Sequence, residues 1–146
     1  MRIADLHRQK ACVVSFELFP PKTPEAERKL FEQTIPDLLR LRPDFLTCTY
    51  GAGGSTRDTT LGIVSRILRD FNVTAASHLT CVGAARAEVA RYLDQAVAGG
   101  IDNIVALRGD PPQGDASFTP HPDGYRYASE LVRYIKSRGQ FSIAVA

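Results

Sequence analysis

The chain has 146 residues, of which 44% are hydrophobic and 23% are charged, and its formal net charge is +2. This length suits one domain with a hydrophobic core, and the near-average composition excludes disordered and fibrous proteins. Positive and negative charges are mixed along the chain. The absence of a basic stripe or a cationic amphipathic segment argues against nucleic-acid binding and against a membrane surface.

Cysteine usage and the first ten residues indicate a cytoplasmic protein. Cys12, Cys48 and Cys81 are far apart and form no Cys-x-x-Cys motif. Free thiols in a reducing compartment are therefore favoured over a disulfide framework or a zinc site. Residues 1–10 lack the apolar core of a signal peptide, and no apolar run approaches membrane-spanning length.

The first predicted strand covers residues 13–19 and ends at a double proline, which cannot donate to a sheet. Five of these seven residues are apolar, and this pattern predicts a strand buried on both faces. Glu17 lies near the end of the strand among apolar neighbours. Such a setting raises the pKa of a carboxyl group, which suits a general acid. An ion pair with a nearby Lys or Arg, or a side chain reaching solvent, is the structural alternative.

Helices and strands alternate after this strand. Capped or amphipathic segments predict helices over residues 24–42, 56–70, 85–98 and 126–138. Short apolar runs predict strands over residues 44–50, 72–79, 103–107 and 141–146. Thr23 is expected to cap the first helix and Pro36 to kink it, and two glycines at 99–100 are expected to end the third.

The spacing of the strands, roughly 30 to 40 residues, is that of one βα unit. It fits either an open doubly wound sheet or part of a barrel. No Gly-x-Gly-x-x-Gly motif follows the first strand, so the dinucleotide fingerprint of a doubly wound fold is absent. We therefore predict an α/β protein, a (βα)8 TIM-type barrel of which this sequence holds about the first four and a half βα units.

Polar residues collect where the predicted strands end: Glu17, Thr49, Tyr50, His78, Thr80, Arg108 and Asp110. In either architecture that edge binds ligands. Each group also has a plain structural interpretation: a satisfied core histidine, a surface turn at 108–110, an ordinary loop at 51–54, or helix packing at Tyr127 and Ala128. Together, one acid, one arginine and several neutral polar groups on a single rim predict a large planar anionic ligand, whose pyrophosphate an arginine can grip.

Four segments carry a family resemblance: Phe-Glu-Leu-Phe-Pro-Pro-Lys at 16–22, Thr-Tyr-Gly-Ala-Gly-Gly-Ser-Thr-Arg-Asp at 49–58, His-Leu-Thr-Cys at 78–81 and Ala-Leu-Arg-Gly-Asp at 106–110. In this order and spacing they resemble the methylenetetrahydrofolate reductase family, from about Val13 to the end of the sequence. The resemblance implies that residues 1–146 are the N-terminal portion of a single FAD-binding (βα)8 catalytic barrel, truncated in the fifth strand. We therefore expect a longer enzyme.

The same resemblance implies reduction of 5,10-methylenetetrahydrofolate to 5-methyltetrahydrofolate, a step of one-carbon and methionine metabolism, with FAD as cofactor and NADH or NADPH as electron donor. Glu17 matches the general acid that helps the folate ring open to an iminium. Asp110 matches an aspartate near flavin and folate that tunes both. Positions that contact the flavin are matched by Thr49, Tyr50, Ala52, His78, Arg108, Gly109, Asp110, Tyr127, Ala128 and Ala146. Substrate-binding positions are matched by Glu17, Thr49 and Asp110, and Thr49 also lies near the nicotinamide.

Two departures and two rival hypotheses accompany this interpretation. Leu18 stands where many members have Phe, and the part of the family after the fifth strand, which carries further FAD contacts, is not in this sequence. One rival is a flavin-free (βα) barrel lyase or aldolase that uses Glu17, although no lysine ends a strand. The other is a fragment without activity of its own. The choice between NADH and NADPH, and between a monomer and a homo-oligomer, stays open.

Overall fold

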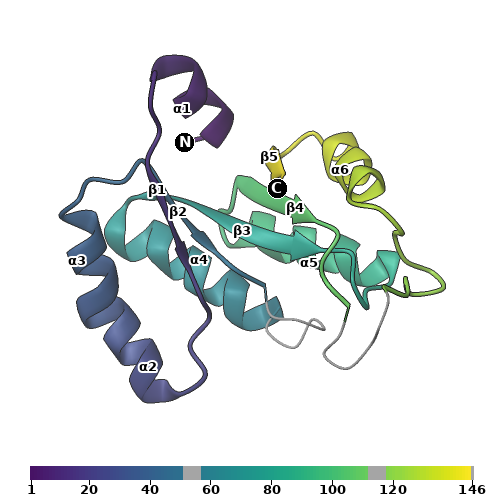
Figure 1. Ribbon diagram of the computed structural model, residues 1–146, viewed down its shortest axis with the longest axis horizontal. Helices are drawn as coiled ribbons and strands as arrows, with labels where there is room; N and C mark the ends of the chain where they lie inside the picture. The colour runs from purple at the N-terminus through teal and green to yellow at the C-terminus, as the bar shows by residue number, and fades with distance from the viewer. Residues whose placement is uncertain (51–56, 112–117, 146) are drawn as a thin grey trace.

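The computed structural model describes residues 1–50, 57–111 and 118–145. Within these residues the chain forms a parallel sheet of five strands (Figure 1). The strands are β1 (Ser15–Leu18), β2 (Phe45–Cys48), β3 (Thr74–Thr80), β4 (Asn103–Leu107) and β5 (Ser142–Val145). The helical segments are α1 (Ile3–Gln9), α2 (Pro24–Lys29), η1 (Leu30–Thr34), α3 (Ile35–Leu39), α4 (Arg57–Phe71), α5 (Arg86–Ala98) and α6 (Ala128–Ser137).

Each strand of the sheet pairs in parallel with the next one in the sequence, in the order β1-β2-β3-β4-β5. A doubly wound sheet reverses its strand order at a switch point, whereas a (βα) barrel keeps consecutive strands adjacent. The predicted α/β class with a parallel sheet is therefore confirmed, and the strand order is the one that a barrel has.

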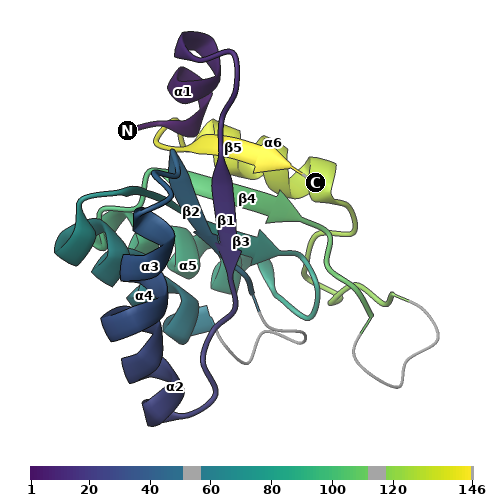
Figure 2. The same ribbon diagram turned by 60° about the vertical axis from the view of Figure 1, so that its left-hand side comes forward.

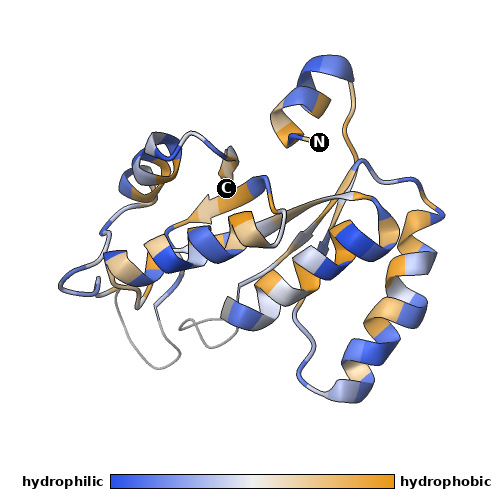
Figure 3. Cartoon of the chain, turned by 180° about the vertical axis from the view of Figure 1, so that it is seen from behind, coloured by the Kyte–Doolittle hydropathy of each residue, from blue (hydrophilic) through white to orange (hydrophobic). Residues whose placement is uncertain are grey.

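Helices α4, α5 and α6 cover one face of the sheet and form the main core with it. Leu46 and Ile104 of the sheet are fully buried there, as are Ile67, Leu93 and Leu131 of the three helices. Seen from behind, α4 and α5 lie side by side, each with hydrophilic and hydrophobic residues (Figure 3). The periodicity located these helices to within two residues. Among the described helices, none is both long and apolar enough to cross a membrane.

The first predicted helix is divided into α2, η1 and α3, and Pro36 explains the division. Thr23 caps α2 as expected, since its hydroxyl accepts from the Ala26 N–H at 3.1 Å. Proline lacks an N–H, and its ring clashes with the carbonyl four residues back in a regular helix. The turn before Pro36 is widened, and the Ile35 N–H donates to the Leu30 carbonyl, five residues back. The predicted interruption is confirmed as a π-helical turn.

Helix α1 was not predicted from the sequence, and it lies at the end of the sheet where the strands begin (Figures 1 and 2). Asn103, the first residue of β4, holds it there. The Ile3 N–H donates to Asn103 Oδ1 at 2.8 Å, and Asn103 Nδ2 donates to the carbonyls of Met1 at 3.0 Å and Ala75 at 3.2 Å. Ile3 and Asn103 are both buried, so a buried amide secures this helix.

The prediction that β1 is buried on both faces is wrong. Ser15 and Glu17 are exposed, whereas Leu18 is buried and Phe16 packs against the core. Side chains alternate along a strand, so Glu17 points away from its apolar neighbours. The strand order places β1 at one edge of the sheet. Among the described residues no second layer covers its outward face, which leaves Phe19, just beyond it, 74% exposed.

The three cysteines are free, as expected. Cys48 and Cys81 are buried, whereas Cys12 is exposed before β1. Burial raises the pKa of Cys48 to about 12 and that of Cys81 to about 11. Both buried thiols are therefore protonated at neutral pH and act as small core residues rather than as nucleophiles.

Candidate active site

Five of the polar residues predicted to form a rim lie at the carboxyl ends of the strands. Glu17 is the last residue but one of β1, and Thr49 directly follows β2. His78 and Thr80 end β3, and Arg108 directly follows β4. Since parallel strands end at the same edge, these side chains share the carboxyl edge of the sheet, where (βα) proteins build their sites.

Glu17 and His78 approach each other on the face of the sheet opposite the helices. Glu17 Oε2 lies 3.4 Å from His78 Nε2, although the two residues are two strands apart. The register explains the approach, because Glu17 lies opposite Thr47, and Thr47 lies opposite Ala76, two residues before His78 on the same face. The structure therefore brings together the ionisable residues of the first and third family segments.

The predicted apolar setting of Glu17 is wrong in this chain. Its side chain is 51% exposed, against 10% for the side chain of His78. The residues that made the sequence around Glu17 apolar, Phe16 and Leu18, point to the helix face instead. Glu17 is thus a half-exposed carboxyl group beside a buried imidazole.

The environment of His78 keeps its imidazole uncharged near neutral pH. Burial lowers the pKa of His78 below its ordinary value of 6.5, and the nearby Glu17 carboxylate opposes this shift with a smaller effect. A buried imidazole is harder to protonate because its charged form loses hydration. His78 is therefore an uncharged imidazole at the rim, with its Nε2 3.4 Å from Glu17 Oε2.

The backbone of β3 is held at His78 from the helix side. The Tyr92 hydroxyl of α5 donates to the His78 carbonyl at 3.0 Å and lies 2.6 Å from Ser77 Oγ. The ring of Tyr50 packs edge-on against Tyr92, with ring centroids 5.9 Å apart. Tyr50, a predicted flavin contact, therefore has its ring in the core. Sequence reasoning missed Ser77 and Tyr92, because only the register of α5 on β3 brings them together.

The segment after β4 makes a close turn at Gly109. Its φ is +86°, and a Cβ there would lie 2.8 Å from Val82 Cγ1 and 3.1 Å from Thr80 Cβ. Only glycine suits this position. The Arg108 carbonyl accepts from the N–H groups of Cys81 and Val82 at 3.1 and 3.2 Å. These contacts bring the end of β4 against the turn that follows β3.

Two groups at the rim fit the flavin dinucleotide that the resemblance implies. Thr80 Oγ1 is buried and has no hydrogen-bond partner among the described residues. Arg108 is exposed, lies 5.0 Å over the Phe118 ring, and forms no ion pair within the described ranges. Buried polar atoms require a partner, and an arginine fork suits a pyrophosphate. The residues present therefore fit a ligand with a polar ring system and a pyrophosphate.

The remaining predicted residues are spread more widely. Asp110 is exposed beyond Gly109, and Tyr127 is 55% exposed just before α6, which begins at Ala128. The Tyr127 N–H donates to Glu130 Oε2 at 3.3 Å. Ala52 and Ala146 lie outside the described residues. The structure thus brings Glu17 next to His78, and Thr49, Arg108 and Asp110 follow strand ends at the same edge of the sheet.

A parallel sheet with consecutive strand order defines an α/β protein of the (βα) type. The ionisable residues at its carboxyl edge make that edge the candidate site. The comparison with protein families then identifies the family. The family model described as methylenetetrahydrofolate reductase matches residues 2–146. The chain belongs to the methylenetetrahydrofolate reductase family.

Curated relatives agree with this assignment. The chain is 39% identical over 147 residues to methylenetetrahydrofolate reductase (NADH) 1 of Arabidopsis thaliana, which covers 99% of the chain and 25% of that protein. It is 40% identical over 152 residues to methylenetetrahydrofolate reductase 1 of Schizosaccharomyces pombe, and the match covers 100% of the chain and 25% of that protein. It is 41% identical over 133 residues to 5,10-methylenetetrahydrofolate reductase of Escherichia coli, and the match covers 91% of the chain and 43% of that protein. The chain thus spans between a quarter and less than half of the length of these relatives.

Proposed function

We propose that residues 1–146 form the N-terminal portion of a single (βα)8 barrel that reduces 5,10-methylenetetrahydrofolate to 5-methyltetrahydrofolate, with electrons from NADH or NADPH. Family membership supports this reaction class, and the name of the Arabidopsis thaliana relative includes NADH. The observation that carries the proposal is the approach of Glu17 to His78 at the carboxyl edge of the sheet. It unites two of the four family segments in one site.

FAD is the proposed cofactor, and when bound it supplies hydride transfer between the nicotinamide donor and the folate. The residues proposed to hold it are Thr49, Tyr50, Ala52, His78, Arg108, Gly109, Asp110, Tyr127, Ala128 and Ala146. Within the described part of the chain, the Thr80 hydroxyl has no hydrogen-bond partner and the exposed Arg108 guanidinium forms no ion pair, and both features support a polar, anionic ligand at this rim. The missing side chain of Gly109 lets the end of β4 lie against Val82 and Thr80, which positions Arg108 and Asp110 at the rim.

Glu17 is the proposed general acid, and it delivers a proton to the folate from a carboxyl oxygen. Its half-exposed side chain lies beside the buried imidazole of His78, which is uncharged because burial lowers the pKa of His78. Thr49 and Asp110 are the proposed further substrate-binding groups, and both lie on the same edge of the sheet.

The test uses the longest chain that the gene encodes, loaded with FAD and studied without oxygen. Glu17→Gln keeps the shape of the side chain and removes the acid. We expect the variant to keep its yellow colour and its flavin reduction by NADH or NADPH. Reduction of 5,10-methylenetetrahydrofolate is expected to fall by about 100-fold or more, the usual contribution of a general acid.

Glu32→Gln serves as the matched control, because Glu32 is an exposed glutamate of η1. This control should leave both flavin reduction by NADH or NADPH and reduction of 5,10-methylenetetrahydrofolate unchanged. Unimpaired folate reduction in Glu17→Gln would remove Glu17 from the role of acid. A full-length protein that binds no flavin would refute the proposed function as a whole.

A further inference from the structure

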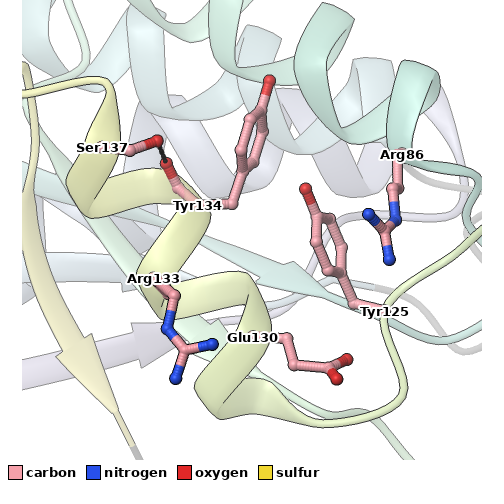
Figure 4. A pocket seen from close by; sticks show the side chains of 6 residues that line it. All are labelled: Arg86, Tyr125, Glu130, Arg133, Tyr134 and Ser137. Atoms are coloured by element: carbon pink, nitrogen blue, oxygen red, sulfur yellow. Dashed lines mark hydrogen bonds between the residues drawn. The ribbon is translucent and has the colours of Figure 1, made fainter.

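A cavity of about 400 Å³ lies between the start of α5 and helix α6, and none of its lining residues belongs to the proposed active site (Figure 4). It is lined by Arg86, Tyr125, Glu130, Arg133, Tyr134 and Ser137. Ligand pockets usually measure about 300 to 1,000 Å³, so a small organic molecule fits this space.

Two tyrosine rings form the flat wall of the cavity. The ring centroids of Tyr125 and Tyr134 are 5.7 Å apart, and the ring planes are inclined by 29°, a stacked arrangement. Tyr125 is buried, Tyr134 is half-buried, and the Arg86 guanidinium lies 5.1 Å from the centre of the Tyr125 ring. Stacked rings beside a guanidinium offer a flat surface to a planar group.

The charges that face the cavity favour an anion. Arg86 and Arg133 form no ion pair with any residue in the described part of the chain. The acidic lining residue, Glu130, is already engaged, since its Oε2 accepts from the N–H groups of Arg126 at 2.7 Å and Tyr127 at 3.3 Å. Its charge stabilises the start of α6. The charge of Arg86 also contributes to the lowered pKa of Glu130, so among the described lining residues two arginines face a single carboxylate.

A second cavity of about 460 Å³ adjoins the first one and is also lined by basic side chains. It shares Arg86 and Glu130 with the first cavity and adds Arg126 and His121. The basic side chains therefore extend along the surface from the tyrosine pair, and a ligand longer than the first cavity would still meet positive charge.

We propose that the cavity between α5 and α6 binds a small organic anion that carries a planar ring. The anionic group lies between Arg86 and Arg133, and the ring lies against Tyr125 and Tyr134. An arginine fork binds carboxylate and phosphate oxygens with two hydrogen bonds. Either anion satisfies this chemistry, and the probes separate the two.

The experiment titrates four probes into the full-length protein, saturated with FAD and labelled with 3-fluorotyrosine, and follows the fluorine NMR signals of Tyr125 and Tyr134. Tyr125→Phe and Tyr134→Phe assign the two signals. Phenyl phosphate and benzoate carry both a ring and an anion, inorganic phosphate carries only the anion, and benzyl alcohol carries only the ring. We expect saturable shifts of both signals with phenyl phosphate or benzoate, and weaker binding of the two partial probes. If phenyl phosphate binds more tightly than benzoate, the preferred anionic group is phosphate; if benzoate binds more tightly, it is carboxylate.

Two arginine variants make the assignment specific. Arg133→Ala should weaken binding by about tenfold or more, the worth of a hydrogen bond to a charged group. Arg91→Ala removes an exposed arginine of α5 that does not line the cavity, and should leave binding unchanged. Raising the salt concentration should also weaken binding, because the arginines are exposed.

Three results would overturn the proposal: no saturable shift with either ring-bearing anion, equal losses in Arg133→Ala and Arg91→Ala, or benzyl alcohol binding as tightly as phenyl phosphate. Arg86→Ala provides a second variant if Arg133→Ala does not fold. The NMR signals report binding without any enzymatic assay, so this result is independent of whether the proposed reductase activity is found.

Discussion

Tyr92 of α5 is hydrogen-bonded to Ser77 of β3, with 2.6 Å between the two hydroxyl oxygens, and both side chains are buried. The Tyr92 hydroxyl donates to the His78 carbonyl at 3.0 Å. A tyrosine hydroxyl has one hydrogen to donate, so Ser77 donates to the Tyr92 oxygen. One helix side chain therefore fixes the strand that carries His78 to the rim, from the face opposite Glu17.

Tyr92→Phe is predicted to destabilise the protein. The change keeps the ring contact with Tyr50 but leaves the Ser77 hydroxyl without this acceptor and the His78 carbonyl without this donor. Leaving buried polar groups unsatisfied costs about 1–3 kcal/mol, and urea denaturation measures the loss. Tyr127→Phe, at an exposed tyrosine, is the control and should change stability by less than about 0.5 kcal/mol. Equal stabilities of the two variants would contradict a structural role for the Tyr92 hydroxyl.

Asn103→Ala is predicted to release helix α1. The variant leaves the Ile3 N–H and the carbonyls of Met1 and Ala75 without their side-chain partner. We expect a loss of about 2–4 kcal/mol, since each buried group left unsatisfied costs about 1–3 kcal/mol before relaxation. Hydrogen exchange at the amides of α1 should become faster than in the unmodified protein.

Ser142→Ala is the matched control for this prediction. Ser142 Oγ accepts from the Ala4 N–H at 3.2 Å, so this variant removes a single hydrogen bond to the same helix. It should cost about 1 kcal/mol and accelerate exchange less than Asn103→Ala does. Unchanged exchange in Asn103→Ala would show that α1 is held without Asn103, by its buried residues Ile3 and Leu6 and by the bond to Ser142.

The elements that the sequence predicted well are those in which apolar pattern and burial coincide. Strand β4 begins and ends at the predicted residues, because Ile104, Val105 and Ala106 are all buried. The burial of β1 was wrongly predicted, since counting apolar residues does not reveal what lies against each face. Helix α1 was missed because its main anchor, Asn103, is 100 residues from Ile3 along the chain.

The site shows the same division between local and long-range information. That the polar residues share one edge was predictable, because parallel strands end together. The approach of Glu17 to His78 was not, because it depends on the register of three strands. The hydrogen bond from Tyr92 to the His78 carbonyl was not predictable either, since the sequence of a helix does not distinguish a tyrosine with this contact from any other core tyrosine.

The stability of the protein is predicted to fall in mild acid because of His78. Burial lowers the pKa of His78 below 6.5 in the folded chain, so the unfolded chain binds a proton there at higher pH. The contribution of the neutral imidazole is therefore complete above about pH 6.5 and is lost as the pH falls from there toward the folded pKa. Urea denaturation between pH 7.5 and about pH 5 should show a smaller decline in His78→Gln than in the unmodified protein. Equal declines would show that His78 has the same pKa in both states.

Glu17→Gln tests whether Glu17 and His78 interact in solution. The Glu17 carboxylate raises the pKa of His78 against the larger effect of burial, so its removal should lower the pKa of His78 further. NMR titration of the His78 ring resonances measures the change. Glu32→Gln, far from the rim on η1, should leave the titration unaltered. A pKa of His78 that rises in Glu17→Gln would mean that the two side chains do not interact in solution as the structure places them.

Gly109→Ala is predicted to disturb the rim more than a substitution that introduces backbone strain alone. Gly109 and Gly139 both have left-handed backbone angles, φ +86° and +70°, but a Cβ at Gly139 meets nothing within 4 Å. Gly139→Ala should therefore cost about 1–2 kcal/mol from backbone strain. Gly109→Ala adds a contact of 2.8 Å to Val82, and this overpacking should destabilise the protein by a further ~1–3 kcal/mol. Urea denaturation compares the two variants, and equal losses would show that the turn at Val82 yields to the added methyl group.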